Sequence, residues 1–356
     1  MGISRVDITL EKGFATAIDA VADRGYEARS FLRTAWYAGT SPDTDGASTL
    51  LLHRADGTPL AALPTLPVGP TILGARRIPG SYWPFRSIPL AADVTAEEIE
   101  ALVAHPPMRR IVSPFLRIGP VYDDDPALAA LTGAARKMGW TVLRRTLGTS
   151  YRIDVAGQLA AGPWPRKSSQ RRLRTYEKQL AAIGQLTIRH ITGSDWSLEV
   201  LRDLATIEAK SWIGQDTDGS GAKFLTESMR AGWLRGAADR ALADMLTATI
   251  LYVGDRPVAF TFDMLCGDMQ YGIAGSYDKE FAAHSPGKLV AYRQYDVALE
   301  RGITTIDLGA GDSGYKRAQG AVPGPEIVDC LIVRHRALAA LLRRKWEGGG
   351  QTPAQE

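Results

Sequence analysis

The sequence predicts an α/β (α+β) protein of two tandem domains, each a mixed, mostly antiparallel sheet flanked by helices. Three observations predict it. A chain of 356 residues is long enough for two domains. Residues 247–277 alternate apolar, β-branched and aromatic stretches with Gly-Asp pairs, as the strands and tight turns of an antiparallel meander do. Residues 49–66 repeat the pattern of residues 249–265, which indicates a duplicated unit.

The second half shows its elements most clearly. After the meander, Ser285 suits a helix N-cap, Pro286 suits the first helical turn, and Gly302 suits the helix exit. An apolar stretch follows that helix. The predicted elements are strands at 247–253, 257–265 and 269–277, a helix at 285–302 and a strand at 304–308.

The first half repeats the hairpin. In both copies an apolar strand meets an Asp-containing turn, then a proline, Pro59 or Pro257, and then a second apolar strand. The other elements predicted there are strands at 71–81, 109–121 and 140–155 and helices at 95–105 and 125–139. We therefore expect an N-terminal domain at 1–155, a C-terminal domain at 156–345 and a disordered, Gly-rich tail at 346–356.

Between the halves, residues 166–184 predict a strongly basic helix with an apolar face at Leu173, Tyr176 and Leu180. Its basic side can be a solvated surface, a wall that contacts phosphate, or a contact with an acidic membrane surface. Aromatic residues are too sparse there to favour single-stranded nucleic acid. Two further helices are predicted at 197–215 and 222–240.

Composition excludes several classes of protein. Lys and Arg total 42 against 39 acidic residues, and this excess is too small to indicate nucleic-acid binding by itself. The two cysteines and five histidines lack the spacing of a metal site, so we expect no metal. The first 20 residues hold no apolar signal region, and no stretch is long and apolar enough to span a membrane, so we expect a cytoplasmic protein.

Two glycine-containing stretches could bind a ligand. Gly309, Gly311 and Gly314 fit G-x-G-x-x-G after a strand, a pattern of dinucleotide-binding proteins and of methyltransferases that bind S-adenosylmethionine. Prolines follow soon and too little chain remains for that fold, so we interpret this stretch as a loop of close backbone approach. The second stretch, residues 284–289, is not a Walker A loop. It predicts either a helix start that binds a pyrophosphate or a well-capped helix with a solvated lysine.

Acid–base catalysis has several candidates. Glu208 lies one helical turn before Trp212, and bulky apolar neighbours can raise the pKa of a carboxyl group toward that of a base. Each candidate can equally be a structural residue. The candidates are Glu208, Asp263, Asp307, Asp312 and Tyr315.

The predicted order of elements is an antiparallel meander, then a helix whose start could bind phosphate, then a further strand. This order resembles the GNAT acyltransferase fold. Four stretches, "SSQRRLRTYEKQLAAIG", "LATIEAKSWIG", "AGSYDKEFAAHSPGKLV" and "IDLGAGDSGYKRAQG", occur in the order seen in the CelD-like acetyltransferases. That family has a double GNAT architecture and is linked to cellulose and other exopolysaccharide synthesis. The resemblance is clearest over residues 165–320. The family often has Trp shortly after its Tyr-Lys pair, where residues 318–320 of this chain read Ala-Gln-Gly.

The resemblance implies an N- or O-acyltransferase that moves an acetyl or other acyl group from acyl-CoA, its co-substrate, to an amine or hydroxyl of a small-molecule or saccharide acceptor. The first domain would be a degenerate copy on the acceptor side. The polysaccharide-synthesis machinery is an implied partner. The implied donor residues are Ser285, Pro286, Gly287 and Lys288 for the pyrophosphate and Ala274, Gly275 and Ser276 for the pantetheine arm.

On the acceptor side, the resemblance implies Glu208 as the base, and Asp307 or Tyr315 are the next candidates for that role. Trp212 and Lys316 would line the acceptor pocket. Arg171 and Arg174 would contact phosphate on the donor or the acceptor.

Two other functions remain open. The same architecture resembles the FemAB-type transferases, which take an aminoacyl group from tRNA, and under this alternative alone we expect a nucleic-acid partner. A non-catalytic scaffold of a polysaccharide synthase complex is the second alternative. A methyltransferase is a more remote third.

Overall fold

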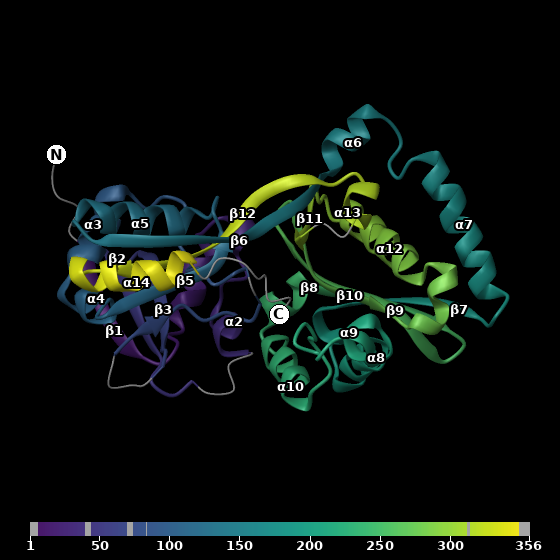
Figure 1. Cartoon of the computed structure of the whole chain (residues 1–356), viewed down its shortest axis with the longest axis horizontal. Helices are drawn as coiled ribbons and strands as arrows, with labels where there is room; N and C mark the ends of the chain where they lie inside the picture. The colour runs from purple at the N-terminus through teal and green to yellow at the C-terminus, as the bar shows by residue number, and fades with distance from the viewer. Residues whose placement is uncertain (1–5, 40–43, 70–73, 83, 312–313, 349–356) are drawn as a thin grey trace. The chain divides into compact units, whose positions relative to one another are not determined.

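A computed structural model describes residues 6–39, 44–69, 74–82, 84–311 and 314–348. The chain forms two compact units, coloured along the chain in Figure 1. Among the described residues, those within 6–149 and 325–348 make the first unit, and those within 150–324 make the second. The predicted domains meet at a single boundary after residue 155, whereas the chain leaves the first unit and later returns to it.

The first unit holds a sheet in the order β1-β2-β3-β4-β5-β12-β6. From β1 to β12 in this order, neighbouring strands are antiparallel except β4 with β5, which run parallel. Strands β6 and β12 each contribute residues to both units. The strands are β1 (Val6–Lys12), β2 (Ser48–Arg54), β3 (Pro59–Pro67), β4 (Arg76–Arg77), β5 (Phe115–Tyr122), β6 (Thr141–Asp154) and β12 (Val322–Val333).

Helices of the first unit follow local signals. The best example is α3, where Thr95 Oγ1 accepts the Glu98 amide and the Glu98 carboxylate accepts the Thr95 amide, a complete capping box. The helices are α1 (Ala17–Asp23), α2 (Thr34–Gly39), α3 (Ala96–Ala104), α4 (Pro106–Ile111), α5 (Pro126–Lys137) and α14 (Arg336–Gly348), with a 3₁₀ turn η1 (Glu27–Arg29).

Helix α14 includes the start of the predicted disordered tail. Residues 346–348 belong to this helix, and the Trp346 ring lies 4.0 Å beneath the Arg145 guanidinium. Ala339 and Trp346 pack against a small apolar cluster with Leu143 and Leu331. The rest of that predicted tail, residues 349–356, lies outside the described residues.

The second unit holds a sheet in the order β6-β11-β10-β9-β8-β7. All its strand pairs are antiparallel except β10 with β11, which run parallel. The strands besides β6 are β7 (Leu186–Thr192), β8 (Leu246–Val253), β9 (Arg256–Cys266), β10 (Met269–Tyr277) and β11 (Thr305–Ala310).

The duplicated hairpin is visible in the strand register. β2 with β3 and β8 with β9 each contain one register shift, and it falls next to the pair His53–Pro59 in one and Tyr252–Pro257 in the other. A proline cannot donate a ladder hydrogen bond, and a bulge is one of the few sheet positions that tolerates it. The two hairpins are therefore equivalent in geometry, as their sequences predict.

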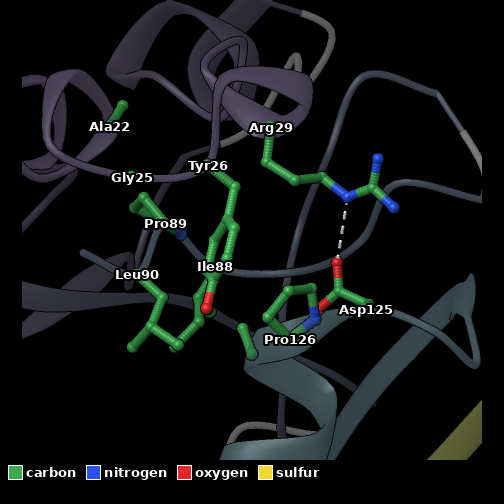
Figure 2. Close-up of a pocket in the computed structure, with 10 residues that line it drawn as sticks. Ala22, Gly25, Tyr26, Arg29, Ile88, Pro89, Leu90, Asp125 and Pro126 are labelled. Carbon is green, nitrogen blue, oxygen red and sulfur yellow. Dashed lines mark hydrogen bonds and ion pairs between the residues drawn. The ribbon is translucent and has the colours of Figure 1, made fainter. Parts of the chain in front are cut away.

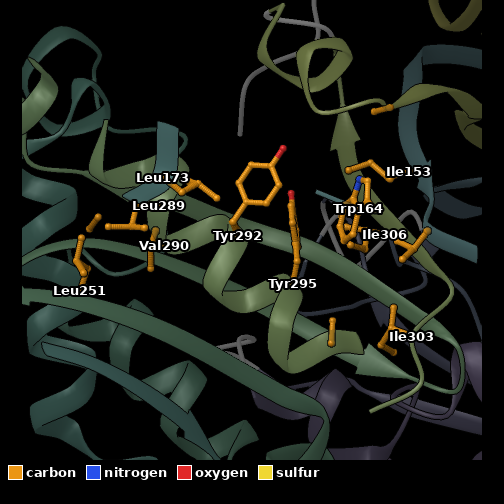
Figure 3. Packing of buried hydrophobic residues seen from close by; sticks show 14 of the residues in the cluster. Ile153, Trp164, Leu173, Leu251, Leu289, Val290, Tyr292, Tyr295, Ile303 and Ile306 are labelled. Atoms are coloured by element: carbon orange, nitrogen blue, oxygen red, sulfur yellow. The ribbon is translucent and has the colours of Figure 1, made fainter. Parts of the chain in front are cut away.

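Helices lie on both faces of the second sheet. α12 packs on β8, β9 and β10, and α8 packs on β9 and β10. Beneath α12 lies an apolar core that includes Leu289, Val290 and Tyr292 and that α7 closes with Leu173 (Figure 3). The helices are α6 (Val155–Ala161), α7 (Lys167–Ala181), α8 (Leu198–Lys210), α9 (Trp212–Asp216), α10 (Glu227–Gly236), α11 (Arg240–Met245), α12 (Pro286–Glu300) and α13 (Tyr315–Ala318), with 3₁₀ turns η3 (Gly193–Asp195) and η4 (Lys279–His284).

The predicted fold class, a mixed and mostly antiparallel sheet flanked by helices, is confirmed. Among the described residues, no helix has both the length and the apolar character needed to cross a bilayer. Within the same residues, no three His, Cys, Asp or Glu side chains gather in a way that could hold a metal ion.

Candidate active site

The sheet of the second unit opens between β10 and β11. Their parallel pairing covers Met269–Tyr271 against Thr305–Asp307, and the remainder of β10 pairs with β9 alone. A bulge in β10 between Gly272 and Ala274 marks the point of divergence. A Cβ at Gly272 would lie 3.3 Å from the Asp307 carbonyl oxygen, so glycine permits the last close approach of the two strands. Beyond it, the β11-side edge of residues 273–277 can meet a ligand.

A carboxylate faces this opening from β9. Asp263 pairs with Gly272 across the strands and is only 4% exposed. Its Oδ1 accepts a hydrogen bond from Gln270 Nε2 at 2.9 Å, and its Oδ2 is buried with no hydrogen-bond partner among the described residues. Burial raises the pKa of Asp263 to about 7. Near neutral pH this group can therefore both take up and release a proton.

The charge of Asp263 affects the pKa of two tyrosines, Tyr295 and Tyr315. Burial, and then the charge of Asp263, raises the pKa of Tyr295 and of Tyr315. The Tyr295 hydroxyl donates to Gln319 Oε1 at 2.6 Å, and Figure 3 shows Tyr295 beside Tyr292 on α12. Tyr315, at the start of α13, is 53% exposed and stays protonated, so it can meet a substrate as a proton donor.

The start of α12 presents fewer free amides than predicted. Ser285 occupies the N-cap position but has a left-handed φ of 47°, and its side chain makes no capping bond. The amides of Lys288 and Leu289 both donate to the Ser285 carbonyl oxygen, at 3.1 and 3.2 Å. Because Pro286 has no N–H, Gly287 supplies the remaining amide of the first turn. A Cβ at Gly287 would lie 2.8 Å from Tyr277 Cδ1, so the Tyr277 ring packs directly on this turn.

Near this helix start, buried polar atoms without partners and an open depression could meet a ligand. Ser276 Oγ and His284 Nδ1 are buried and have no hydrogen-bond partner among the described residues. Lys288 is half-buried in the first turn of α12. An open depression of about 620 Å³ also borders η4. It is lined by Lys210, Gln215, Arg256, Asp278, Lys279 and Glu280. Amide and phosphate groups of a donor could satisfy these polar atoms.

Glu208, the base that the resemblance implies, is completely buried in α8. Its two carboxylate oxygens accept the amides of Lys223 and Phe224 at 2.8 and 2.7 Å. Burial raises the pKa of Glu208, while these amides oppose the shift. Both oxygens of Glu208 therefore fasten the loop before α10, and its role as a base stays a prediction.

Asp307 and Lys316 brace the glycine loop from inside. Asp307 Oδ2 accepts from Arg152 Nε at 2.9 Å, and Oδ1 accepts the Gly309 amide at 2.8 Å. Lys316 Nζ donates to the carbonyl oxygens of Gly309 and Ala310 at 2.9 and 2.7 Å and is 4% exposed. Both side chains are near the opening but are occupied in holding its β11 side.

The other predicted residues are spread over the second unit. Ala274, Gly275 and Ser276 lie on β10 beyond the divergence. Trp212 is 43% exposed at the start of α9, and Arg171 and Arg174 are exposed on α7. The candidate Asp312 lies outside the described residues.

Asp263 is one of the five acid–base candidates that the sequence indicates, but the sequence alone does not show that it lies beside the opening between β10 and β11. A signal was present, since an aspartate in the otherwise apolar strand 257–265 is rarely buried without a purpose. Neither Tyr295 nor Gln319 is among the site residues that the sequence predicts. Tyr295 reads as one member of an apolar helical stripe, and its hydrogen bond to Gln319 depends on the return of the chain after β11.

The first unit offers no comparable opening in its described part. A small cavity of about 10 Å³ lies between α1, η1 and the start of α5, with the Arg29–Asp125 ion pair (3.2 Å) at its edge (Figure 2). It has room for about one water molecule. The counterpart of β10 in this unit, β4, is two residues long.

Residues 167–317 match the family model of the acetyltransferase (GNAT) domain. The second unit carries a GNAT-type acetyltransferase domain. The divergence of β10 and β11 ahead of α12 lies inside that domain, and so do Asp263 and Tyr315. The CelD-like branch within this superfamily stays a prediction.

Solved structures show the same fold across the whole chain. FemX has a TM-score of 0.62 at 13% identity, covering 91% of this chain and 97% of FemX. The C-terminal domain of a putative lysylphosphatidylglycerol synthetase from Agrobacterium fabrum has a TM-score of 0.54 at 13% identity, covering 92% of each chain. L-PGS from Bacillus licheniformis has a TM-score of 0.53 at 14% identity, covering 95% of this chain and 98% of the other. Among curated proteins, no sequence matches significantly.

Proposed function

We propose that the protein is an acyltransferase that moves an acetyl or other acyl group from acyl-CoA to an amine or hydroxyl of a small-molecule or saccharide acceptor. The observation that carries this proposal is the opening between β10 and β11 with Asp263 buried beside it. A role in exopolysaccharide or cellulose synthesis and a cytoplasmic location are parts of the same proposal. They rest on the resemblance to the CelD-like proteins.

In this proposal the donor supplies an activated thioester carbonyl. The acceptor nitrogen or oxygen forms a bond to that carbonyl carbon while the carbon–sulfur bond breaks. Asp263, ionised near pH 7, takes the proton that the acceptor loses, and the protonated Tyr315 hydroxyl gives a proton to the departing sulfur. Backbone amides on the free edge of β10 would donate to the developing oxyanion.

Donor binding is assigned to two neighbouring segments. Ala274, Gly275 and Ser276 on β10 would flank the pantetheine arm, and the Ser276 hydroxyl is free to bond it. The Gly287 amide and Lys288, at the start of α12, would meet the pyrophosphate, with Ser285 and Pro286 shaping the turn. Within the described residues of the first unit, β4 is two residues long, so we place donor binding in the second unit.

Acyl-CoA binding tests the proposal directly. We expect acetyl-CoA to raise the melting temperature of the wild type and Lys288→Glu to remove that shift. Arg202→Glu, an equal change of charge at an exposed position of α8, should keep it. Gly287→Asp is a poor probe, because any Cβ there meets the Tyr277 ring. If no acyl-CoA of any chain length binds the folded wild type, a non-catalytic scaffold is the better description.

One observation favours a second candidate, a transferase that takes its acyl group from aminoacyl-tRNA. Lys167, Arg171, Arg174 and Lys178 follow the spacing i, i+4, i+7, i+11 along α7, and all four are exposed. This basic stripe runs about 16 Å along the helix and lies roughly opposite the buried Leu173 and Leu180. A row of exposed cations suits a phosphate backbone.

For this candidate we expect tRNA affinity to fall at least tenfold between about 50 and 200 mM salt. The double change Arg171→Glu and Arg174→Glu should weaken binding further, and Arg202→Glu should not. Binding that ignores both salt and the double change would reject this candidate.

A further inference from the structure

A chain of buried polar groups lies under α12, beside the apolar core. The exposed His190 on β7 shares a hydrogen bond of 2.9 Å between its Nδ1 and Thr249 Oγ1 on β8. Thr249 Oγ1 in turn donates to Gln294 Oε1 on α12 at 2.6 Å. Thr249 and Gln294 are fully buried. The chain of contacts thus runs from the protein surface into the space between α12 and the sheet.

The chain continues toward Asp263 through atoms that lack partners. Thr249 stands opposite Thr261 in the β8–β9 register, and Thr261 and Asp263 point to the same face of β9 because side chains alternate along a strand. The Thr261 hydroxyl is near enough to Asp263 to lower the pKa of its carboxyl group, against the larger effect of burial. Four buried atoms in this layer have no hydrogen-bond partner among the described residues: Gln294 Nε2, Thr261 Oγ1, Asp263 Oδ2 and Gln270 Oε1.

Four unpartnered polar atoms in one layer require an explanation. A buried polar atom without a partner destabilises the folded state, and native proteins avoid that cost with ordered water. A buried water needs two to four polar partners and a polar site. These atoms supply such partners, and they join the two ends of the interrupted chain.

We propose that ordered water molecules fill this layer and connect Asp263 to His190 as a proton path from the active site to solvent. The path rests on the proposed function, in which Asp263 takes a proton from the acceptor at each turnover. That proton leaves Asp263 for the adjacent water, and each water passes one proton onward. The Thr249 hydroxyl, which donates to Gln294 Oε1 at rest, turns to His190 Nδ1, gives its proton there and takes another from the neighbouring water. His190 receives one proton on Nδ1 and releases one from Nε2 to solvent. Tyr315, which is 53% exposed, takes one proton from solvent to replace the one it gave to the sulfur, so no net charge stays inside. Gln270 and Gln294 are positioning residues, since their amides hold water without titrating.

Charged groups around the two ends allow this direction of transfer. Glu300 and Asp296 on α12 favour the charged form of His190, whereas Arg293 and the larger effect of burial lower its pKa below the ordinary value. His190 is therefore mostly neutral at pH 7 and can accept a proton and release it to solvent. At the inner end, burial and the charge of Asp263 raise the pKa of Tyr295 and of Tyr315, so neither hydroxyl is charged near pH 7.

Three variants test the path with acyl transfer as the readout. Thr249→Val removes the hydroxyl that joins His190 to the interior, and we expect kcat near pH 7 to fall about tenfold. Thr249→Ser keeps the hydroxyl and should keep the rate. His190→Ala should lose a similar factor and regain it when imidazole is added, because a small buffer can reach the vacated outer end. Imidazole should not rescue Thr249→Val. Equal rates in the Val and Ser variants, or no rescue of His190→Ala, would overturn the path.

A crystal structure of the wild type at high resolution separates failure of the path from failure of the proposed function. Ordered waters within hydrogen-bond distance of Asp263 Oδ2, Thr261 Oγ1 and Gln294 Nε2 are expected whether or not an acyl acceptor is known. A dry layer would reject the path while leaving acyl transfer intact. Absence of any acyl transfer by the wild type would reject the function on its own.

Discussion

Replacing Asp263 by Asn tests the buried carboxylate on which the candidate site depends. The pKa of Asp263 rises from an ordinary 3.8 to about 7 on folding. Between those pH values the folded protein binds more protons at this position than the unfolded chain does. The contribution of Asp263 to the free energy of unfolding therefore falls as pH increases through this window and levels off above about pH 7. Asn does not titrate, so the variant lacks this fall.

The size of the effect follows from the shift. About 3 pH units at about 1.4 kcal/mol each give a change of about 4 kcal/mol in the stability difference between Asp263→Asn and wild type. Urea unfolding at pH 4, 5, 6, 7 and 8 measures that difference. We expect the variant to gain stability relative to wild type at each step up to pH 7. A difference that stays constant from pH 4 to 8 would refute the burial of an ionisable Asp263.

Asp307→Asn is the matched control. Asp307 is as buried as Asp263, but its carboxylate pairs with Arg152 at 2.9 Å. Removing one partner of such a pair costs about 3 kcal/mol. At pH 8 the two Asp-to-Asn changes should therefore shift stability in opposite directions. In the assay of acyl transfer, kcat/KM of the wild type should rise through about pH 7, and Asp263→Asn should lose about a hundredfold.

Two further changes test the structural roles of predicted site residues. Lys316→Met leaves the Gly309 and Ala310 carbonyl oxygens without their donor, so the free energy of unfolding should drop by about 2 kcal/mol and amide exchange in the glycine loop should accelerate. If amide exchange in the glycine loop stays unchanged, Lys316 does not hold that loop in place. Glu208→Ala strands the amides of Lys223 and Phe224, and urea unfolding should show a loss of about 3 kcal/mol. A loss below about 1 kcal/mol would argue that water replaces the carboxylate.

Local signals were enough to predict most of the elements. The Thr95–Glu98 capping box forms within one helical turn, and both hairpins have their turn and proline side by side in the sequence. The meander β8-β9-β10 and the helix after it followed from the same short-range patterns. These features depend on neighbours a few residues apart, which a single sequence displays.

The roles of the acidic residues depended on contacts from distant parts of the chain. Glu208 resembles a catalytic base in sequence because its helix places it near Trp212. Its burial comes from the loop at residues 222–225, which folds back over it. The helix also ends sooner than predicted, since Ser211 bonds the Glu208 carbonyl oxygen and caps a new helix at Trp212. The spacing of residues in the sequence does not show which later segment will fold over a given side chain.

The return of residues 325–348 to the first unit has a consequence for synthesis on the ribosome. Strand β12 pairs with β5 from Phe115 to Tyr122, and α14 covers an apolar cluster that includes Leu143. The first unit therefore lacks a strand and a helix until the last part of the chain has emerged. The second unit, whose residues are already out, can complete its core first, which reverses the usual order in which domains fold as they are made.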